Sequence, residues 1–596
     1  MQTSRLALVA GLYSAVATGS FYGFSVYSKA LKHQFGLTQS QLGNINTLPY
    51  AFGLLSPLFG GIPTRIGKGK TLLLGGSILT CMQILLYILS TSGRDALLAT
   101  CAAPALLVLT TVVMYWGNII VTSVAFATPV QHWPLNRSLA IACVKSFVGM
   151  GGAAVTQLYR ALYGVPTDDP AALRCLLLWA GATIICAGVS ATAVPELADA
   201  EGGAGAEPVR MLHWVFAEIF ILGVFTTATP HLTGAAHTAL VVVMLLLTFL
   251  PIGLALGVDG RRAPSTNPND EESRSPSLAL EGAPIACAPS DVAPVDPVAV
   301  GPGAIQLAGA EDDEVGSAKR PLTESETQLP FREMVRTPEA WLLYWCGLVL
   351  IGSGNCIATQ MAFIFQSADA AEELVTTCVT TFSVGNLFGR LLIMRVTDGL
   401  TRRGMSRAWF VVASCVLMGL AQLGFLIGAV PGAIAGGSAA QSSLYTAASG
   451  GAGLAFGSIW PLLVVLTSEI FGSTHLPTNY LFYDGGCGSV GTVVLANLLP
   501  SSIYEMAGAG TGGNSTGTFL QGAAASGRGA AAALGNGSAV CTAPGDAPDR
   551  PKVCLGPTCF ADTHVVLIVL CALGVLAAAE LSRRTTPLYA RLAAAA

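Results

Sequence analysis

Apolar runs close to 20 residues long recur along the whole chain, and each is long enough for a helix to cross a bilayer. Only 11% of the 596 residues are charged and 52% are hydrophobic, whereas soluble domains carry about 25% charged residues. A soluble fold of this length would need far more polar surface. The sequence therefore predicts an all-α, multi-pass membrane protein. With a net charge of -4 and no strongly basic block, we expect no nucleic-acid partner.

The apolar runs fall into three groups, which predict the domain organisation. Residues 1–200 carry six predicted spans, residues 201–258 two more, and residues 338–596 the last six, which makes about 14 transmembrane helices. Residues 259–337 are rich in Pro, Ala, Ser and acidic residues, so we predict a disordered cytosolic linker, either passive or regulated by phosphorylation. The spans are predicted near residues 6–27, 42–63, 71–90, 104–127, 138–162, 174–194, 213–231, 237–257, 341–365, 374–395, 408–430, 445–468, 478–503 and 563–582.

Basic residues orient the predicted spans. Most of the 30 Lys and Arg residues lie on the cytosolic side if both chain termini are cytosolic. Residues 504–562 then form an exoplasmic loop, in which Asn514 and Asn536 are glycosylation candidates. The membrane is expected to be the plasma membrane or an endomembrane such as that of the vacuole. The loop also has three cysteines, which allow one disulfide in three ways: Cys541, Cys554 and Cys559.

A repeat relates the two halves of the chain. A shift of 339 residues (484 − 145) places Lys145 on Asp484, in the fifth predicted span of each half. The glycines four and seven residues later share a helical face with the charged residue, and small residues let helices approach closely. Parallel repeats of this kind build the major facilitator fold, which we predict as two six-helix bundles with an extra helix pair between them. The matched glycines are Gly149 with Gly488, and Gly152 with Gly491.

The loops after the second span of each half agree with this fold. Residues 60–70 read GGIPTRIGKGK, which is similar to the glycine-rich basic signature of major facilitator proteins. Thr64 stands where an aspartate usually precedes Arg65, so this half lacks the aspartate of an ionic latch. The second half, with GNLFGRLLIMRVTDGLTRRG, offers Asp398 with Arg402 or Arg403 for such a latch. The gating-loop candidates are Arg65, Lys68, Arg390, Asp398 and Arg402.

Longer motifs resemble those of the nodulin-like family of eukaryotic major facilitator transporters. The fifth span reads CVKSFVGMGGAAVTQLYRALYG, and VGNLFGRLL, GLAFGSIWPLLVVLTSEIFG and CLGPTCF follow in the second half. The extra helix pair ending in LLLTFLPIG and the long central linker also fit. The resemblance implies a multi-pass membrane transporter and does not imply a particular substrate.

Polar residues recur at helical spacing on the spans that line the central cavity of this fold, namely the first and fourth of each half. Hydroxyl groups can instead bond back to their own helix, but an unpaired Asn in hydrocarbon is costly, so the set favours a cavity. The cavity candidates in the first half are Ser14, Thr18, Tyr22, Ser25, Thr111, Tyr115, Asn118 and Thr122. Those in the second half are Asn355, Thr359, Ser449, Gly453, Phe456 and Trp460.

Lys145 lies within a predicted span, and three interpretations stay open for it. Its ammonium reaches the interface along a flexible stem, or it pairs with Asp484, or it faces the cavity as a substrate-binding cation. Asp484 has the same three interpretations, with proton coupling as its functional version. Glu218, in the seventh span, lies outside the expected cavity and is expected to make a polar contact between helices.

The sequence predicts a secondary transporter of a small polar solute that works by alternating access. An organic anion is the natural substrate if Lys145 faces the cavity, with proton coupling through Asp484. A transporter-like receptor that signals through the central loop is the alternative, and a lipid-modifying enzyme is a distant third. The sequence has no Walker loop, metal-ligand cluster or nucleophile elbow, so we expect neither an enzyme nor a cofactor nor a metal. The expected partners are the small-molecule substrate, protons if transport is coupled, and the lipid bilayer; no obligate protein partner is expected.

Overall fold

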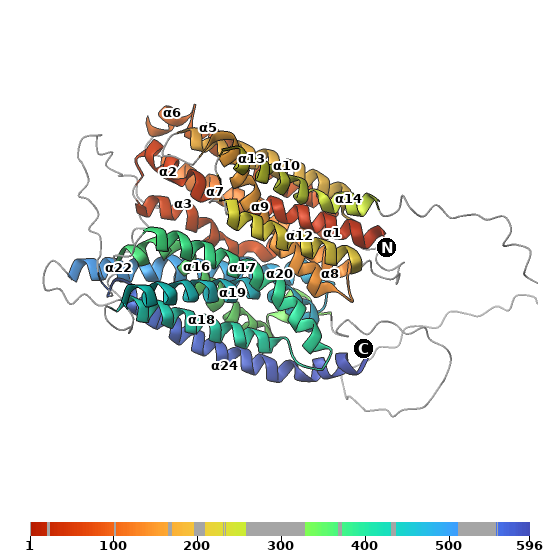
Figure 1. Ribbon diagram of the computed structural model, residues 1–596. Helices are drawn as coiled ribbons and strands as arrows, with labels where there is room; N and C mark the ends of the chain where they lie inside the picture. Colours follow the sequence, from red (N-terminus) through yellow and green to blue (C-terminus); the bar gives the residue numbers. More distant parts are fainter. Residues whose placement is uncertain are drawn as a thin grey trace, which may run out of the picture. The chain divides into compact units, whose positions relative to one another are not determined.

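The computed structural model describes residues 2–20, 24–37, 39–99, 103–164, 170–195, 209–229, 232, 234–257, 328–367, 372–430, 437–510, 556 and 558–595. Throughout these residues the regular secondary structure is helical (Figure 1). The predicted sites Tyr22, Asn514 and Asn536, the cysteines Cys541 and Cys554, and residues 259–327 of the predicted linker lie outside the described residues.

The helices of the first half and of the segment after it follow the predicted spans. Gly67, with φ of +88°, separates two of these helices within the GGIPTRIGKGK loop, and Gly164, with φ of +84°, ends a third; both positive φ angles favour glycine. The helices are α1 (Gln2–Thr18), α2 (Phe24–Phe35), α3 (Gln39–Ala51), the 3₁₀ helix η2 (Phe52–Gly61), α4 (Ile62–Ile66), α5 (Lys68–Ser90), α6 (Arg94–Ala99), α7 (Ala103–Ala125), α8 (Ala127–His132), α9 (Arg137–Tyr163), η3 (Pro170–Leu173), α10 (Arg174–Ala193), α12 (Val209–Ala228), α13 (Gly234–Thr248) and α14 (Leu250–Gly257).

The second half contains longer helices and two π-helical segments. Its fifth span is divided among five consecutive helical segments, whereas α9, the equivalent span of the first half, is one continuous α-helix. The helices are α15 (Phe331–Met334), α16 (Pro338–Ser367), α17 (Glu372–Thr401), α18 (Ala408–Ala429), α19 (Gly437–Phe471), α20 (Leu476–Leu481), the π-helix η6 (Phe482–Cys487), α21 (Gly488–Val493), the π-helix η7 (Val494–Leu498), α22 (Leu499–Gly510) and α24 (Thr558–Ala595).

Twelve helices within the described residues are long and apolar enough to cross a membrane. They correspond to the third to fourteenth predicted spans, so the predicted count of 14 is not confirmed. The first predicted span is divided between α1, which has 17 residues, and α2. The second is divided among α3, η2 and α4. Pro57 lies within η2, and a proline removes a backbone donor and interrupts a continuous α-helix.

Each half packs mainly on itself. In the first half α5 lies between α7 and α10, and α1 packs on α9 and α10. In the second half α17 packs on α19, and α18 packs on both α19 and α24. The inserted helices α12 and α13 pack against α9. The start of α1 and the end of α24 lie at the same end of the helices (Figure 1).

The contacts between the halves are reciprocal. The fifth span of the first half, α9, packs on α17, the second span of the second half. Conversely η2, from the second span of the first half, packs on α20 and η6 of the fifth span of the second half. Two equivalent pairings are what a duplicated unit produces when its copies face one another. The predicted fold class, an all-α membrane protein built from two helical bundles as in the major facilitator fold, is therefore confirmed, although the count of 14 spans is not.

Glycines permit the contact between η2 and η6. A Cβ atom built on Gly485 would lie 1.7 Å from Oγ of Ser56, and one built on Gly53 would lie 2.6 Å from the backbone oxygen of Gly485. A Cβ on Gly60 would lie 2.4 Å from Cα of Thr478. Any side chain at these positions would therefore separate the halves, which is the role that small residues have where helices cross closely.

Candidate functional site

Lys145 and Asp484 form an ion pair that joins the two halves. Lys145 is the ninth residue of α9, about 12 Å from its start at 1.5 Å per residue, and only 4% of it is exposed. Its Nζ lies 3.3 Å from Oδ1 of Asp484. The hydroxyl of Tyr480, one helical turn before Asp484, is hydrogen-bonded to both charged groups. The ammonium is thus buried between the halves, and this geometry differs from that of a lysine reaching the interface.

Three aromatic rings surround the ammonium of Lys145. Its Nζ lies 3.6 Å from the ring centre of Phe126, 4.8 Å from that of Tyr480 and 5.2 Å from that of Trp460. Phe126 comes from the first half and the other two residues from the second. A cation over an aromatic face is stabilised by the ring quadrupole, most strongly where water is excluded. The rings therefore help to hold a charge that hydrocarbon alone would not tolerate.

Arg390 adds a second cation to the site. It lies on α17, is buried, and donates from Nη1 to the backbone oxygen of Lys145 at 2.6 Å. Its Nε donates to Oδ1 of Asn386 at 3.1 Å, one turn earlier on the same helix. Among the described residues, the site thus combines two cationic groups with one carboxylate. Its local charge is positive, although the chain as a whole is acidic.

The position of Asp484 depends on a local change of helix type. The sequence FYDGGC forms the π-helix η6, and such single-turn widenings are frequent at functional sites. Two glycines directly follow Asp484, and the first of them presses against Ser56 of η2. Lys145, by contrast, lies on a regular α-helix. Equivalent sequence positions therefore differ in local geometry, and the difference lies where the two charges meet.

Some predicted cavity residues make polar contacts to other helices. The ring of Trp460 on α19 faces the ammonium of Lys145 on α9, with 5.2 Å from Nζ to the ring centre. The hydroxyl of Tyr115 lies 3.4 Å from Oγ of Ser489 across the two halves. Asn355 donates from Nδ2 to the hydroxyl of Thr492 at 2.7 Å within the second half.

Other predicted cavity residues bond back to their own helices. The hydroxyls of Thr18 and Thr359 donate to backbone oxygens three or four residues earlier, the local bond that competes with a role in the cavity. The Thr111 hydroxyl lies 2.9 Å from the backbone oxygen of Val108 on its own helix and 3.2 Å from that of Ile45 on α3. The hydroxyls of Ser14 and Ser449 and the side-chain oxygen of Asn118 are buried without a hydrogen-bond partner among the described residues. Thr122 is buried, and the side chain of Ser25 lies outside the described part.

Two positions in the fourth span of the second half serve packing. A Cβ on Gly453 would lie 2.1 Å from the backbone oxygen of Phe382, so this glycine lets α19 approach α17. Phe456 stacks on the ring of Phe382, with 5.8 Å between the ring centres.

Thr64 and Lys68 of the GGIPTRIGKGK loop form hydrogen bonds with uncharged groups. The hydroxyl of Thr64, which stands where an aspartate was expected from the signature, donates to the backbone oxygen of Gly61 at 2.8 Å. Arg65 is exposed. Lys68 donates from Nζ to the side-chain oxygen of Gln131 at 3.1 Å, and Gln131 donates in turn to the backbone oxygen of Ser473 in the other half at 3.3 Å. Gln131 lies in the short helix α8, and no motif in the sequence indicates its role.

The ionic latch of the second half has a different arginine from the one predicted. Asp398 pairs with Nη2 of Arg407 at 2.7 Å, whereas Arg402 and Arg403 are exposed. Arg407 also contacts Glu469 from α19, with 3.0 Å from its Nε to Oε1. Burial alone would lower the pKa of Arg407, but the two carboxylates outweigh burial and raise this pKa. The predicted pairing differs because Arg402 and Arg403 lie on a solvent-facing turn after α17.

Glu218 lacks the polar contact that was expected for it. Its carboxyl is buried, and neither oxygen has a hydrogen-bond partner within the described residues.

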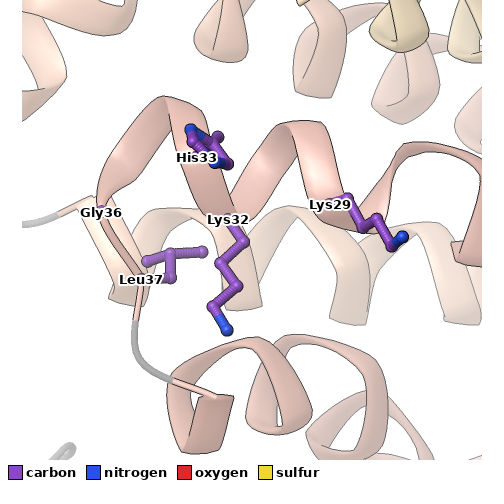
Figure 2. A pocket seen from close by; sticks show the side chains of 5 residues that line it. All are labelled: Lys29, Lys32, His33, Gly36 and Leu37. Atoms are coloured by element: carbon purple, nitrogen blue, oxygen red, sulfur yellow. The ribbon is translucent and has the colours of Figure 1, made fainter. Parts of the chain in front are cut away.

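A pocket of about 490 Å³ lies at the end of α2. It is lined by Lys29, Lys32, His33, Gly36 and Leu37, and Figure 2 shows that the three basic side chains point in different directions. Because these groups do not converge on one point, we assign no ligand to this pocket.

Together, the fold and the ion pair define the class of this protein. It is an all-α, multi-pass membrane protein with the major facilitator fold, in which paired charges join the equivalent fifth spans of two repeats. Within this class, the predicted resemblance to the nodulin-like family is confirmed over residues 5–256, which the family model described as Nodulin-like matches. The motifs after residue 338 lie outside this match and remain resemblances.

One curated relative is "Protein NUCLEAR FUSION DEFECTIVE 4" of Arabidopsis thaliana. It is 27% identical over 274 residues, which cover 44% of this chain and 37% of that protein. The match thus spans little more than a third of the relative's length, and the printed name states no substrate.

Solved structures similar to the chain include three transporters, each 12% identical in sequence. The proton:xylose symporter XylE, bound to 6-bromo-6-deoxy-D-glucose, has a TM-score of 0.49 over 89% of this chain and 94% of that chain. The human organic anion transporter MFSD10 (TETRAN) has a TM-score of 0.44 over 95% and 99%, respectively. The transporter FucP in its outward conformation has a TM-score of 0.43 over 96% and 98%. None of these likenesses assigns a substrate to this chain.

Proposed function

We propose that this protein is a secondary transporter of a small organic anion and works by alternating access between its two halves. The observation that carries the proposal is the buried ion pair between Lys145 and Asp484. A charged contact between the two parts that must separate is a natural point of control, because it holds one arrangement until another charge replaces it.

The charges of the site favour an anion as substrate. Lys145 and Arg390 bring two positive groups, and Asp484 brings one negative group. An incoming carboxylate can take the place of Asp484 beside Lys145 without leaving the ammonium unpaired in a poorly hydrated site. An incoming cation would meet two positive groups and only one carboxylate. Electrostatic interactions are strong in such a site, so this difference favours an anion over a cation as the substrate.

The same pair offers a route for proton coupling. A proton that binds Asp484 removes its charge, which weakens its attraction to Lys145 and frees the ammonium for a substrate anion. The Tyr480 hydroxyl is hydrogen-bonded to both groups, so it can stay bonded to either of them when they separate. Proton and anion would then enter the site together, as in an anion:proton symporter.

Uptake by reconstituted protein tests the proposal. Proteoliposomes should accumulate one or more labelled organic anions from a panel that also contains sugars and organic cations, and a pH gradient should raise the uptake. The double variant Lys145→Met with Asp484→Asn removes both charges, so it should fold and yet lose anion uptake. Lys29→Met, an exposed lysine on α2, is the matched control and should retain uptake.

The contrary outcomes are equally specific. Uptake of only cations or neutral sugars would overturn the anion assignment. Normal anion uptake by the folded double variant would show that the pair is not the substrate site. If no solute in a broad panel accumulates although the protein is folded, the transporter proposal itself fails.

A further inference from the structure

Glu218 is a buried carboxyl in the middle of an inserted helix. It is the tenth of the 20 residues of α12, about 14 Å from either end at 1.5 Å per residue, and only 2% of it is exposed. It shares the buried face of α12 with Val215, Ile219 and Leu222, and α12 packs against α9, α13 and α17. The carboxyl therefore faces the protein interior among apolar side chains.

No group within the described residues compensates a charge on Glu218. Neither of its oxygens has a hydrogen-bond partner. Tyr13 of α1 and Cys143 of α9 are close enough to interact with it electrostatically, but both are neutral groups. The Tyr13 hydroxyl already donates to the backbone oxygen of Thr248 at 2.8 Å, and the Cys143 thiol points to the backbone oxygen of Leu212 at 4.0 Å.

Charged and titratable side chains described on the neighbouring helices have partners other than Glu218. Lys145 of α9 pairs with Asp484, and it lies two residues from Cys143, on a different face of the helix. Arg395 of α17 contacts His213, near the start of α12, at 3.4 Å. His237 of α13 contacts the side chain of Gln157 at 3.1 Å. Arg390 of α17 donates to the backbone oxygen of Lys145, and Cys186 of α10 interacts with Tyr13.

An ionised carboxylate at this position would lie unpaired in a medium of low polarity. Such burial is so unfavourable that the group takes up a proton instead. We propose that Glu218 is a proton-binding site, separate from the Lys145–Asp484 pair, which holds its proton in the conformation described. Release of the proton requires water at Glu218, and water reaches it only when α12 moves away from α9.

This mechanism gives the inserted helix pair a role that the two six-span bundles lack. Proton binding at Glu218 favours packing of α12 on α9, and proton loss favours their separation. If the protein is the transporter proposed above, the protonation of Glu218 links a pH gradient to the movement of these helices. That link rests on the proposed function, whereas the proton-binding site itself does not.

Infrared spectroscopy of the purified protein tests the site directly. A protonated carboxylic acid has a C=O stretching band separate from the bands of an ionised carboxylate. At neutral pH the full-length protein in detergent should show an acid band that the variant Glu218→Gln lacks. Glu339→Gln is the matched control, because Glu339 is ion-paired with Arg584 at 3.2 Å and should contribute no acid band. Identical acid-band regions in folded wild type and Glu218→Gln would overturn the proposal.

Thermal unfolding gives an independent readout. Unfolding exposes Glu218 to water, where it ionises at neutral pH, so the folded state binds one more proton than the unfolded state. Stability from this group must therefore fall as pH rises, by up to about tenfold in the unfolding equilibrium constant per pH unit for a single proton. Because an unfolded Glu ionises at about pH 4.3, the melting temperature of wild type should fall more steeply from about pH 5 to neutral pH than that of Glu218→Gln. Parallel curves would contradict the proposal.

Uptake measurements separate the site from the transport mechanism. If wild type accumulates an anion in response to a pH gradient, Glu218→Gln should lose the gradient effect. If wild type transports nothing, the proposed function fails while the infrared result still decides the proton site. A gradient effect that persists unchanged in Glu218→Gln would overturn the coupling role.

Discussion

Lys145 and Asp484 occupy equivalent positions in the two repeats, 339 residues apart, and their side chains meet at 3.3 Å. Equivalent positions of the two repeats therefore supply both partners of one contact, with opposite charges. The neighbours of the pair are also shared between the halves, with Phe126 from the first and Trp460 from the second. Separation of the halves at this point must break this ion pair.

Removing one partner of the pair should destabilise the protein. Lys145→Met leaves Asp484 unpaired, and Asp484→Asn leaves the ammonium unpaired, so each should cost about 3–5 kcal/mol of stability. The double variant leaves no unpaired charge and should recover most of this loss. Unfolding of the three variants in detergent, compared with wild type, measures the free energies. A double variant as unstable as the sum of the singles would contradict a direct pair.

The hydroxyl that bridges the pair should contribute separately from its ring. Tyr480→Phe keeps the aromatic face near Lys145 but removes hydrogen bonds to two charged groups, so a loss of about 1.5–3 kcal/mol is expected. Tyr483→Phe is the matched control, because within the described residues the Tyr483 hydroxyl donates to one uncharged group, the backbone oxygen of Ala340, at 3.4 Å. Tyr483→Phe should therefore lose less stability than Tyr480→Phe in the same unfolding assay. Equal losses in the two variants would show that the bridge adds nothing.

Arg407, instead of Arg402, should be the arginine that stabilises the second half. Arg407→Gln leaves Asp398 and Glu469 without their cation, and we expect a loss of about 3–5 kcal/mol. Arg402→Gln changes an exposed side chain and should stay within about 0.5 kcal/mol of wild type. Melting temperatures of the two variants test this order. A larger loss of melting temperature in Arg402→Gln than in Arg407→Gln would support the pairing of Asp398 with Arg402 that the sequence predicted.

The contact between η2 and η6 should not tolerate a side chain at Gly485. Gly485→Ala places a methyl group 1.7 Å from Oγ of Ser56, so the halves must shift and stability should fall, with partial recovery when Ser56→Gly is added. Gly149→Ala on α9 is the control, since nothing lies within 4 Å of the added atom. Alanine favours a helix by about 1 kcal/mol over glycine, so this variant should be as stable as wild type or more so. Yield and melting temperature after purification distinguish the two.

The predicted orientation can be tested through the two sequons. If residues 504–562 are exoplasmic, Asn514 and Asn536 can carry glycans, and Asn514→Gln with Asn536→Gln should remove a glycosidase-sensitive mass from protein made in eukaryotic cells. An epitope tag in residues 259–337 should be accessible only after the cells are permeabilised. Accessibility of that tag in intact cells would reverse the orientation.

The membrane class, the approximate positions of twelve spans and the equivalence of Lys145 with Asp484 were all predictable from sequence. Apolar length and helical periodicity are local properties of the chain, and a repeat is detected by comparing two segments without knowing where they lie. The broken second span was less predictable. Its composition is apolar, and its prolines, Pro49, Pro57 and Pro63, are the signal of the interruption that the structure shows between α3, η2 and α4.

Contacts between distant residues depended on the tertiary structure. Sequence spacing suggested Arg402 for Asp398, but the fold turns Arg402 to the surface and brings Arg407 inward. Likewise, Gly149 has open space, although its repeat position suggested helix packing, whereas Gly485 lies in close contact. Lys145 had three open interpretations, because the residue itself does not reveal what faces it. The angle and register at which helices cross decide these contacts, and both result from the packing of many side chains that are far apart along the chain.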